Sequence, residues 1–317
     1  MAELTITAEP LCRAGRKRRL VDMVLFFNEI DLLEIRLQEL SDVVDTFVIV
    51  ESDRTFAGRA KPFFVERFQG RFAEWASKIV YHQAHFNIAF APKQSERFAN
   101  EALHRDEFTT LATKLDLAPD DIVVIADVDE VWHPRCADVL PEMLRDADLV
   151  SFVLKNYRGY TNNIGNYALN GQPWRGPVAC FAGLLGTERP DRIRRYSRSP
   201  EEPCGYTVST LTDAGWHFSS MGGAEAFWIK SQNFSHTTDP YRVVEVDARE
   251  QEVRVFTGPM SREDCAAAQR LYLDHAPDAF EYSPLSYAGF EIEQDVPAAM
   301  RANKEHYRRF FFFSDCV

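Results

Sequence analysis

Residues 21–50 decide the fold and read VDMVLFFNEI DLLEIRLQEL SDVVDTFVIV. The stretch opens with a continuous apolar run, 21–27, and closes with another, 43–50, the pattern of strands that are buried on both faces. Between them, from Ile30 to Leu40, apolar residues recur at helical spacing with charged residues such as Arg36 in between. Strand, helix and strand with short joints form a βαβ unit, so the sequence predicts parallel strands joined by a right-handed crossover.

Predicted strands and helices continue to alternate up to about residue 155, and after it this regular alternation gives way to loop-like segments. The expected fold class is therefore α/β, a mostly parallel sheet flanked by helices, with C-terminal helical additions. Up to residue 155, we predict strands at 78–82, 122–126 and 149–154, helices at 96–115 and around 142–145, and a helical or irregular segment at 63–75. Beyond it, we predict loops at 156–176 and 197–205, strands at 178–185 and 215–219, and helices at 261–272 and 296–313.

Composition and charge limit the classes of function. A chain of 317 residues with 45% hydrophobic and 26% charged residues fits one globular α/β domain with additions. The formal net charge of −12 argues against general nucleic-acid binding, because a phosphate backbone favours a basic surface. One basic cluster lies within 13–19, and we interpret residues 1–19 as a flexible, solvated arm, in preference to a tether for anionic membranes.

The cysteines and apolar runs bear on the cellular compartment. None of the six cysteines forms a CxxC pair, and their scatter fits reduced thiols, so we expect a cytoplasmic protein. No apolar run is long enough for a transmembrane helix, and the run 21–27 lacks the cleavage site of a signal peptide. The aromatic segment 310–313 could touch a membrane interface, although packing onto the domain is the preferred interpretation.

Polar residues follow three of the predicted strands: Asn28-Glu29, Glu51-Ser52-Asp53 and Asp127-Val128-Asp129-Glu130. Open α/β sheets bind ligands at the carboxyl ends of their strands, so these groups are expected to meet in one crevice. In an extended backbone Asp127 and Asp129 would point to the same side. Buried carboxylates need neutralisation, and oxygen ligands suit Mg²⁺ or Mn²⁺. The alternative is a simple turn or helix cap, because Asp-x-Asp is common by chance.

Taken together, several ordered motifs make the chain resemble glycosyltransferase family 17. The resemblance extends from about Asp22 to the C-terminal helix. The motifs are Phe27-Asn28-Glu29, Leu32-Leu33-Glu34-Ile35-Arg36-Leu37, Val48-Ile49-Val50-Glu51-Ser52, Thr55-Phe56, Gly58, Ala126-Asp127-Val128-Asp129-Glu130 and Gly215-Trp216-His217-Phe218-Ser219.

This resemblance implies a GT-A-type, Rossmann-like nucleotide-sugar domain. It further implies a UDP-sugar donor, with UDP-N-acetylglucosamine expected, and transfer with inversion at the anomeric carbon. Residues 20–155 would form the nucleotide-sugar-binding half, and residues 156–317 the acceptor-binding half with the C-terminal helices. The human-type enzyme of this family has a membrane anchor and a lumenal stem, and the sequence shows neither. The acceptor could therefore be a glycan, a glycolipid or a small molecule.

Candidate residues follow for the donor and the metal. Asp127 and Asp129 match the Asp-x-Asp of the family and would hold Mn²⁺ or Mg²⁺ against the donor diphosphate. His217 and His236 are further candidate metal ligands. The remaining candidates for donor binding, beside Asp127, are Asn28, Glu51, Ser52, Arg97 and Trp216. For Asn28 a helix cap, and for Arg97 an exposed helical face, are open alternatives.

Inverting transfer also needs a carboxylate that accepts the proton of the acceptor hydroxyl. Glu225, Glu130 and Asp239 are the candidates, and Glu130 could instead support Asp129. The loop containing Tyr157, Tyr160 and Asn162 would contact the acceptor, because aromatic and amide side chains suit sugars; an ordinary tyrosine-rich surface loop is the alternative.

Two other classes of function remain open at this point. A degenerate transferase would bind sugar or nucleotide without catalysis, and a nucleotidyltransferase could use a similar α/β core. A kinase or ATPase is disfavoured because the chain has no Walker-type phosphate loop.

Overall fold

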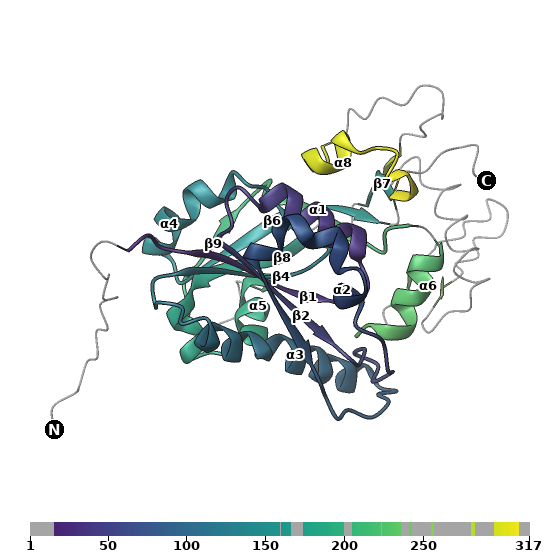
Figure 1. Cartoon of the computed structure of the whole chain (residues 1–317), viewed down its shortest axis with the longest axis horizontal. Helices are drawn as coiled ribbons and strands as arrows, with labels where there is room; N and C mark the ends of the chain where they lie inside the picture. The colour runs from purple at the N-terminus through teal and green to yellow at the C-terminus, as the bar shows by residue number, and fades with distance from the viewer. Residues whose placement is uncertain are drawn as a thin grey trace.

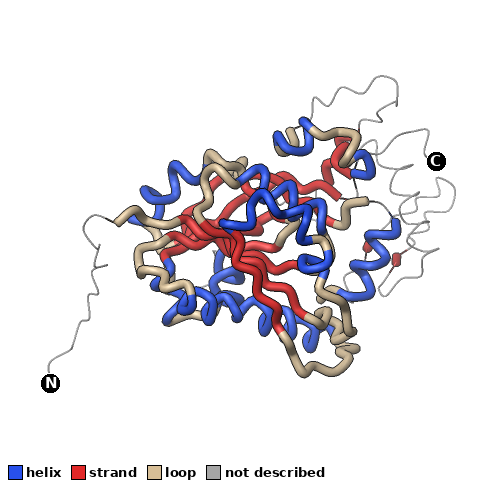
Figure 2. The backbone as a smooth tube through the Cα atoms, in the orientation of Figure 1, coloured by secondary structure: helices blue, strands red, loops and turns tan. Residues whose placement is uncertain are grey.

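The structure is a computed structural model that describes residues 16–158, 160–165, 174–199, 205–222, 224–235, 241–242, 255–256, 280–282 and 295–310. A mixed β-sheet forms its centre, and helices cover both faces of this sheet (Figures 1 and 2). The α/β fold class predicted from the sequence is confirmed.

The first half of the sheet is parallel, as the pattern of apolar runs predicts. Its strands lie in the order β3-β2-β1-β4, and α1 (Ile30–Leu40) connects β1 to β2. These strands are nearly continuous apolar runs because helices cover them on both sides. The strands are β1 (Leu20–Phe26), β2 (Thr46–Ser52), β3 (Ile79–Ala84) and β4 (Ile122–Asp127).

The second half of the sheet is largely antiparallel, so the sheet as a whole is mixed and not mostly parallel. β8 (Trp174–Phe181) runs antiparallel to β4, and β6 (Leu149–Arg158) runs antiparallel to β8. The remaining strands of this sheet are β5 (Glu130–Trp132), β7 (Tyr160–Gly165), β9 (Val208–Leu211), β10 (Gly215–Ser219) and β13 (Phe280–Tyr282). A separate pair joins β11 (Tyr241–Arg242) to β12 (Val255–Phe256).

The loop predicted at 156–176 is partly wrong, because the end of β6, all of β7 and the start of β8 lie within it. Asn and Gly are poor strand formers, which is why the sequence favours a loop there. Pairing with neighbouring strands overrides that weak local preference.

Two apolar cores fill the spaces between the sheet and its helices. On one face α1 packs beside residues of α2 (Phe64–Arg67), η1 (Gln69–Lys78) and α4 (Cys136–Asp146). On the other face lie α3 (Gln94–Lys114), η2 (Ala182–Gly186) and α5 (Pro190–Arg198). The molecule therefore has three layers, which Figure 1 shows with α1 and α4 above the sheet and α3 and α5 below it.

A third core ties the C-terminal segment to α1. It joins Leu32 and Ile35 of α1 to residues of α8 (Ala298–Ala302) and η4 (Arg308–Phe310). Within 296–313, predicted as a helix, the described residues thus form two short helical turns. Phe310 is buried, which agrees with packing onto the domain; residues 311–317 and 261–272 lie outside the described residues.

The last residues of the predicted N-terminal arm are held to the domain. Arg16 and Arg19 both pair with the buried carboxylate of Asp121, which precedes β4. Lys17 pairs with Asp45 at 3.0 Å. The segment 16–19 is therefore part of the folded domain, and residues 1–15 lie outside the described part. Within the described residues, none of the helices combines the length and apolarity needed to cross a bilayer.

Arg36 departs most clearly from the expected amphipathic helix, because it is fully buried under the sheet. Its Nε and Nη2 donate to the two carboxylate oxygens of Asp22 on β1, at 2.6 and 2.7 Å. Its Nη1 donates to the carbonyl oxygens of Glu130, at 2.7 Å, and Asp127, at 3.3 Å. Trp132 Nε1 also donates to Asp22, at 3.0 Å. One guanidinium thus joins α1 and β1 to the turn that follows β4.

We predict that Arg36→Ala lowers the free energy of unfolding by about 3–5 kcal/mol, because the substitution leaves Asp22 buried without its counter-charge. Urea unfolding at neutral pH measures this loss. The matched control is Arg145→Ala, which removes an exposed arginine paired with Glu142 at 3.7 Å and should cost no more than about 0.5 kcal/mol. Equal losses for the two variants would contradict a structural role for the buried pair.

Candidate active site

Two cavities open where β1, β2 and β4 end. The larger has a volume of about 810 Å³ and the smaller about 230 Å³. They share five lining residues: Phe27, Glu29, Asp129, Ser220 and Lys230. Ligand pockets commonly measure about 300–1,000 Å³, so the larger cavity suits a nucleotide-sized ligand and the smaller one a single sugar-sized unit.

The acidic turn lies between β4 and β5, beside the larger cavity. Asp127 ends β4, and the chain turns at Val128 and Asp129 before β5 begins at Glu130. The alternation expected for an extended backbone therefore does not apply, and Asp127 and Asp129 have different partners.

Asp127 is held by two buried arginines. Its Oδ1 accepts from Arg105 of α3 at 2.9 Å, and its Oδ2 accepts from Arg194 of α5 at 2.7 Å. Burial alone would raise the pKa of Asp127, but the charges of Arg194 and Arg105 outweigh it and hold the pKa far below its usual range. Both carboxylate oxygens are thus engaged by arginine, which differs from the expected role of Asp127 as a metal ligand.

Glu130 stabilises the same turn through three hydrogen bonds. Its Oε1 accepts from Arg194 at 2.6 Å and from Trp174 Nε1 at 2.9 Å, and its Oε2 accepts from the backbone N–H of Asp127 at 2.9 Å. A Cβ at Gly176 would lie 2.5 Å from Oε1, so glycine is needed there. Glu130 is fully buried and lines neither cavity, so its geometry fits support of the turn and not contact with an acceptor.

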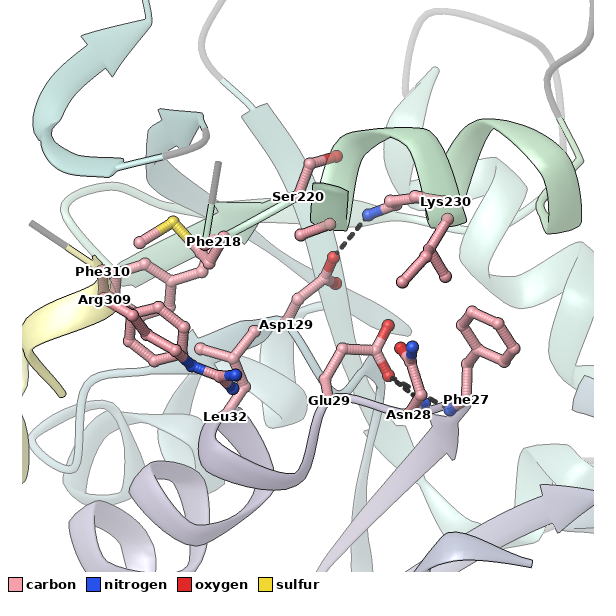
Figure 3. A pocket seen from close by; sticks show the side chains of 14 residues that line it. Phe27, Asn28, Glu29, Leu32, Asp129, Phe218, Ser220, Lys230, Arg309 and Phe310 are labelled. Carbon is pink, nitrogen blue, oxygen red and sulfur yellow. Dashed lines mark hydrogen bonds and ion pairs between the residues drawn. The ribbon is translucent and has the colours of Figure 1, made fainter. Parts of the chain in front are cut away.

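Asp129 faces a histidine and a lysine. Its Oδ2 accepts from Lys230 Nζ of α6 (Ala224–Asn233) at 2.8 Å and lies 3.7 Å from His217 Nε2 of β10 (Figure 3 shows the Lys230 contact). His217 Nδ1 donates to Asn156 Oδ1 at 2.8 Å, and Trp174 stacks on the imidazole with ring centroids 4.0 Å apart. Burial lowers the pKa of His217 to about 4, so the ring is neutral at pH 7 and Nε2 carries a lone pair.

This arrangement fits a divalent metal ion. A neutral imidazole nitrogen and a carboxylate oxygen lie 3.7 Å apart in the lining of the larger cavity, and nitrogen and oxygen atoms of these kinds are metal ligands. The hydrogen bond from Nδ1 to Asn156 fixes the orientation of the ring, as is usual for metal-binding histidines. In the structure, the ammonium group of Lys230 supplies the positive charge beside Asp129.

A second group of possible ligands, Asp31, Glu34 and His306, lies on α1 and the C-terminal segment. Arg71 pairs with both carboxylates, and Arg309 pairs with Asp31 at 2.5 Å. Arginine compensates the charges of this group, and its ion pairs join the C-terminal segment to α1.

Two of the other predicted donor-binding residues lie at the cavities. Ser52 lines the larger cavity and Asn28 the smaller one. Asn28 does not cap α1 through its side chain; its backbone N–H donates to Glu29 Oε2 at 2.9 Å.

Three predicted donor-binding residues are instead buried away from both cavities. Glu51 accepts from Lys61 at 2.6 Å, from Tyr81 at 2.8 Å, and from two backbone N–H groups at the start of α2. Arg97 donates to the carbonyl oxygens of Ala91 and Phe234, and Trp216 donates to Asp295. The sequence shows that these residues can form hydrogen bonds. It does not show that their partners come from the protein itself and not from a ligand.

The predicted acceptor and base residues are described only in part. Tyr157 is buried against Phe218, and its hydroxyl donates to the carbonyl oxygen of Asp295 at 2.6 Å, so it does not face an acceptor. Tyr160 and Asn162 lie on β7 and Glu225 on α6, but their side chains lie outside the described part. His236 and Asp239 lie wholly outside the described residues.

The sequence analysis missed several residues that surround the acidic turn. Arg194 is one of them, and a signal for it was present: Pro190 stands in the first turn of α5, a position that favours helix initiation. Which arginine of that helix faces inward could not be read from a segment so rich in charge. Arg105 and Lys230 were also missed. Glu29 was recognised only as part of a polar strand end, and Asn156 only as the start of a predicted loop, with no role for either side chain.

Comparison with known proteins identifies the relatives of this chain. The sequence model of glycosyltransferase family 17 matches residues 11–258. The chain belongs to glycosyltransferase family 17. Three mammalian proteins named beta-1,4-mannosyl-glycoprotein 4-beta-N-acetylglucosaminyltransferase are similar to it. The rat and human proteins are 34% identical and the mouse protein 33% identical, each over 256 residues. The match covers 71% of this chain but only 44% of the relatives' own length.

Solved structures resemble this family 17 chain more distantly. A 4-diphosphocytidyl-2C-methyl-D-erythritol synthase has a TM-score of 0.39 at 14% identity, covering 63% of this chain and 90% of that one. Glucosyl-3-phosphoglycerate synthase from Mycobacterium tuberculosis, in complex with Mn²⁺, UDP and glucosyl-3-phosphoglycerate, has a TM-score of 0.35 at 15% identity, covering 63% of this chain and 71% of that one.

The contribution of Glu130 to the stability of the fold should depend on pH. Burial raises the pKa of Glu130, but the charge of Arg194 outweighs it, so the pKa in the folded protein lies below the unfolded value of about 4.3. The ionised group therefore stabilises the fold above that pH, and the contribution is lost as the pH falls through the folded pKa. Glu130→Gln should cost about 1.5–3 kcal/mol at pH 7 and progressively less below pH ~4.

Urea unfolding of the wild type and Glu130→Gln between pH 3 and pH 7 measures this difference. Glu142→Gln is the matched control, because its side chain is 78% exposed. A difference between wild type and Glu130→Gln that stays constant, or widens, as the pH falls would contradict the ion-pair account.

Proposed function

We propose that this chain is a metal-dependent, inverting glycosyltransferase that moves N-acetylglucosamine from UDP to a hydroxyl group. The observation that carries the proposal is the proximity of Asp129 and His217 in the lining of a nucleotide-sized cavity, where the strands of the sheet end. Membership of family 17 and the names of the mammalian relatives support the choice of sugar and reaction.

The residues around the larger cavity divide into two groups. At the ends of β1 and β2, Phe27 and Ser52 lie where a nucleoside would bind. At the acidic turn, Asp129 and His217 would hold Mn²⁺ or Mg²⁺, and Arg198 lines the same cavity. A bound divalent ion neutralises charge on a departing diphosphate, which favours its release.

The protein's own cations and aromatic rings complete this site. Arg198 lies over the ring of Trp174, 5.0 Å from its centroid, and both line the larger cavity. The indole, which also stacks on His217, holds the guanidinium of Arg198 at the cavity, where it could contact an anionic group. Lys230 reaches the same place from α6 and would contact the diphosphate when it is not paired with Asp129.

For the acceptor, we propose only the chemical classes to which it could belong. The mammalian relatives are named for a β-1,4-mannosyl glycoprotein, and this chain spans less than half of their length. A glycan, a glycolipid and a small glycoside are therefore the acceptor classes to test, with methyl β-D-mannopyranoside as the simplest probe.

We predict micromolar binding of UDP and UDP-N-acetylglucosamine in the presence of Mn²⁺, and its loss with EDTA or in Asp129→Ala. The reason is that two anionic phosphates lack compensation once the ion is removed. Titration calorimetry measures the binding, and Asp138→Ala, on α4, is the control. Binding that is equally strong with EDTA and in Asp129→Ala would contradict the metal site. Binding without release of UDP would favour a non-catalytic module, and release of pyrophosphate would indicate a nucleotidyltransferase.

We predict that Asn156→Leu weakens the apparent affinity for Mn²⁺ by about 10–100-fold, because His217 loses the acceptor that orients its ring. Titration of Mn²⁺ at fixed UDP measures this affinity. Asn156→Asp keeps an acceptor for Nδ1–H and should retain affinity within about tenfold. Equal affinity of Asn156→Leu and the wild type would show that His217 is not a ligand.

A further inference from the structure

The smaller cavity lies next to the proposed donor site and differs from it in character. Leu32, Phe218, Met221 and Phe310 give it mainly apolar walls. Its polar end is formed by the residues that it shares with the larger cavity, and Figure 3 shows these side chains around the Lys230–Asp129 contact. A ligand in the smaller cavity would therefore meet a ligand in the larger one at this shared end.

Glu29 stands at that shared end, in the joint between β1 and α1. Its Oε2 accepts from the backbone N–H groups of Phe27 at 3.1 Å and Asn28 at 2.9 Å, which fixes the carboxylate. In the described part of the chain, no hydrogen bond engages Oε1. Figure 3 shows the carboxylate turned into the cavity, beside Asp129.

The other acidic residues at the cavities are committed elsewhere. Both oxygens of Asp127 accept from arginines, and Asp129 faces His217 and Lys230. Glu101, which lines the larger cavity, accepts from Arg105 at 2.8 Å and also from Ser235. Asp129 is assigned to the metal ion under the proposed function. Within the described residues, Glu29 is then the carboxylate at the junction of the cavities that is left to accept a proton, through Oε1.

Building on the proposed transferase function, we propose that Glu29 is the general base of the reaction and that the smaller cavity is the acceptor subsite. The acceptor would be a hydroxyl group on a unit with one apolar face, such as the C–H face of a pyranose. The volume of about 230 Å³ and the apolar walls suit a single unit of this kind.

The chemical step balances without a further reactant. The proton of the acceptor hydroxyl passes to Oε1 of Glu29 as its oxygen forms a bond to the anomeric carbon. The bond from that carbon to the β-phosphate oxygen breaks, and its electron pair leaves with UDP. After the products depart, Glu29 returns the proton to water.

Glu29→Gln is the decisive variant, because its amide oxygen can still accept the two backbone N–H bonds while the basic group is lost. UDP release from UDP-N-acetylglucosamine with Mn²⁺ is measured with water as acceptor and, separately, with azide, which is already an anion and needs no base. We expect release with water to fall at least ~100-fold. Release with azide and calorimetric binding of UDP with Mn²⁺ should stay within about threefold of the wild type, because neither requires a base.

Two further variants complete the test. Glu34→Gln removes a carboxylate of α1 that pairs with Arg71 and lines neither cavity, and it should leave release with water unchanged. Ala226→Phe would fill the smaller cavity, which Ala226 lines. It should abolish transfer to methyl β-D-mannopyranoside but preserve release with azide.

The possible outcomes test the transferase function, the role of Glu29 and the acceptor subsite separately. A wild-type protein that releases no UDP with either water or azide overturns the proposed transferase function itself. An active wild type together with a Glu29→Gln variant that remains active with water overturns only the role of Glu29. Loss of Mn²⁺-dependent UDP binding in Glu29→Gln would place Glu29 in the donor site and overturn its role as base. Unimpaired transfer to the mannoside by Ala226→Phe would overturn the acceptor subsite.

Discussion

The buried guanidinium of Arg36 is the constraint on which the rest of the site depends. An arginine is placed under a sheet at a large desolvation cost, which only a bidentate carboxylate and further acceptors can offset. Asp22 provides the first, and the carbonyl oxygens of Asp127 and Glu130 provide the second. The backbone of the acidic turn is therefore fixed relative to β1, which lines the larger cavity, and α1, which lines the smaller one.

A second set of arginines fixes the side chains of the same turn. Arg105 and Arg194 come from helices on the opposite face of the sheet from Arg36, and they meet at Asp127. The two carboxylates of the Asp-Val-Asp turn thereby differ in function. Asp127 anchors the turn to the scaffold, whereas Asp129 lines the cavities and pairs there with Lys230 beside His217.

The sequence was sufficient for the parts of the fold that depend on local pattern. The apolar runs of β1, β2 and β4 predicted the parallel half of the sheet, and the polar strand ends predicted where the cavities lie. It was insufficient where burial depends on a distant partner. Arg36 looks like a surface charge of an amphipathic helix until Asp22 is placed against it, and Glu51 looks like a donor-binding residue until Lys61 is placed against it. The helix α5 carries too much charge for its buried face to be recognised from spacing.

The packing of the C-terminal segment against α1 has a consequence for the order of events during synthesis. Residues up to Asp129 contain the whole parallel half of the sheet, whereas Arg309 and Phe310 line the smaller cavity. A ribosome releases the first of these segments long before the second. The two main cores include residues as far along the chain as Ala214, so both can be complete before translation reaches Arg309 and Phe310. A chain that stopped between these points would contain both cores but would lack part of the wall of the smaller cavity.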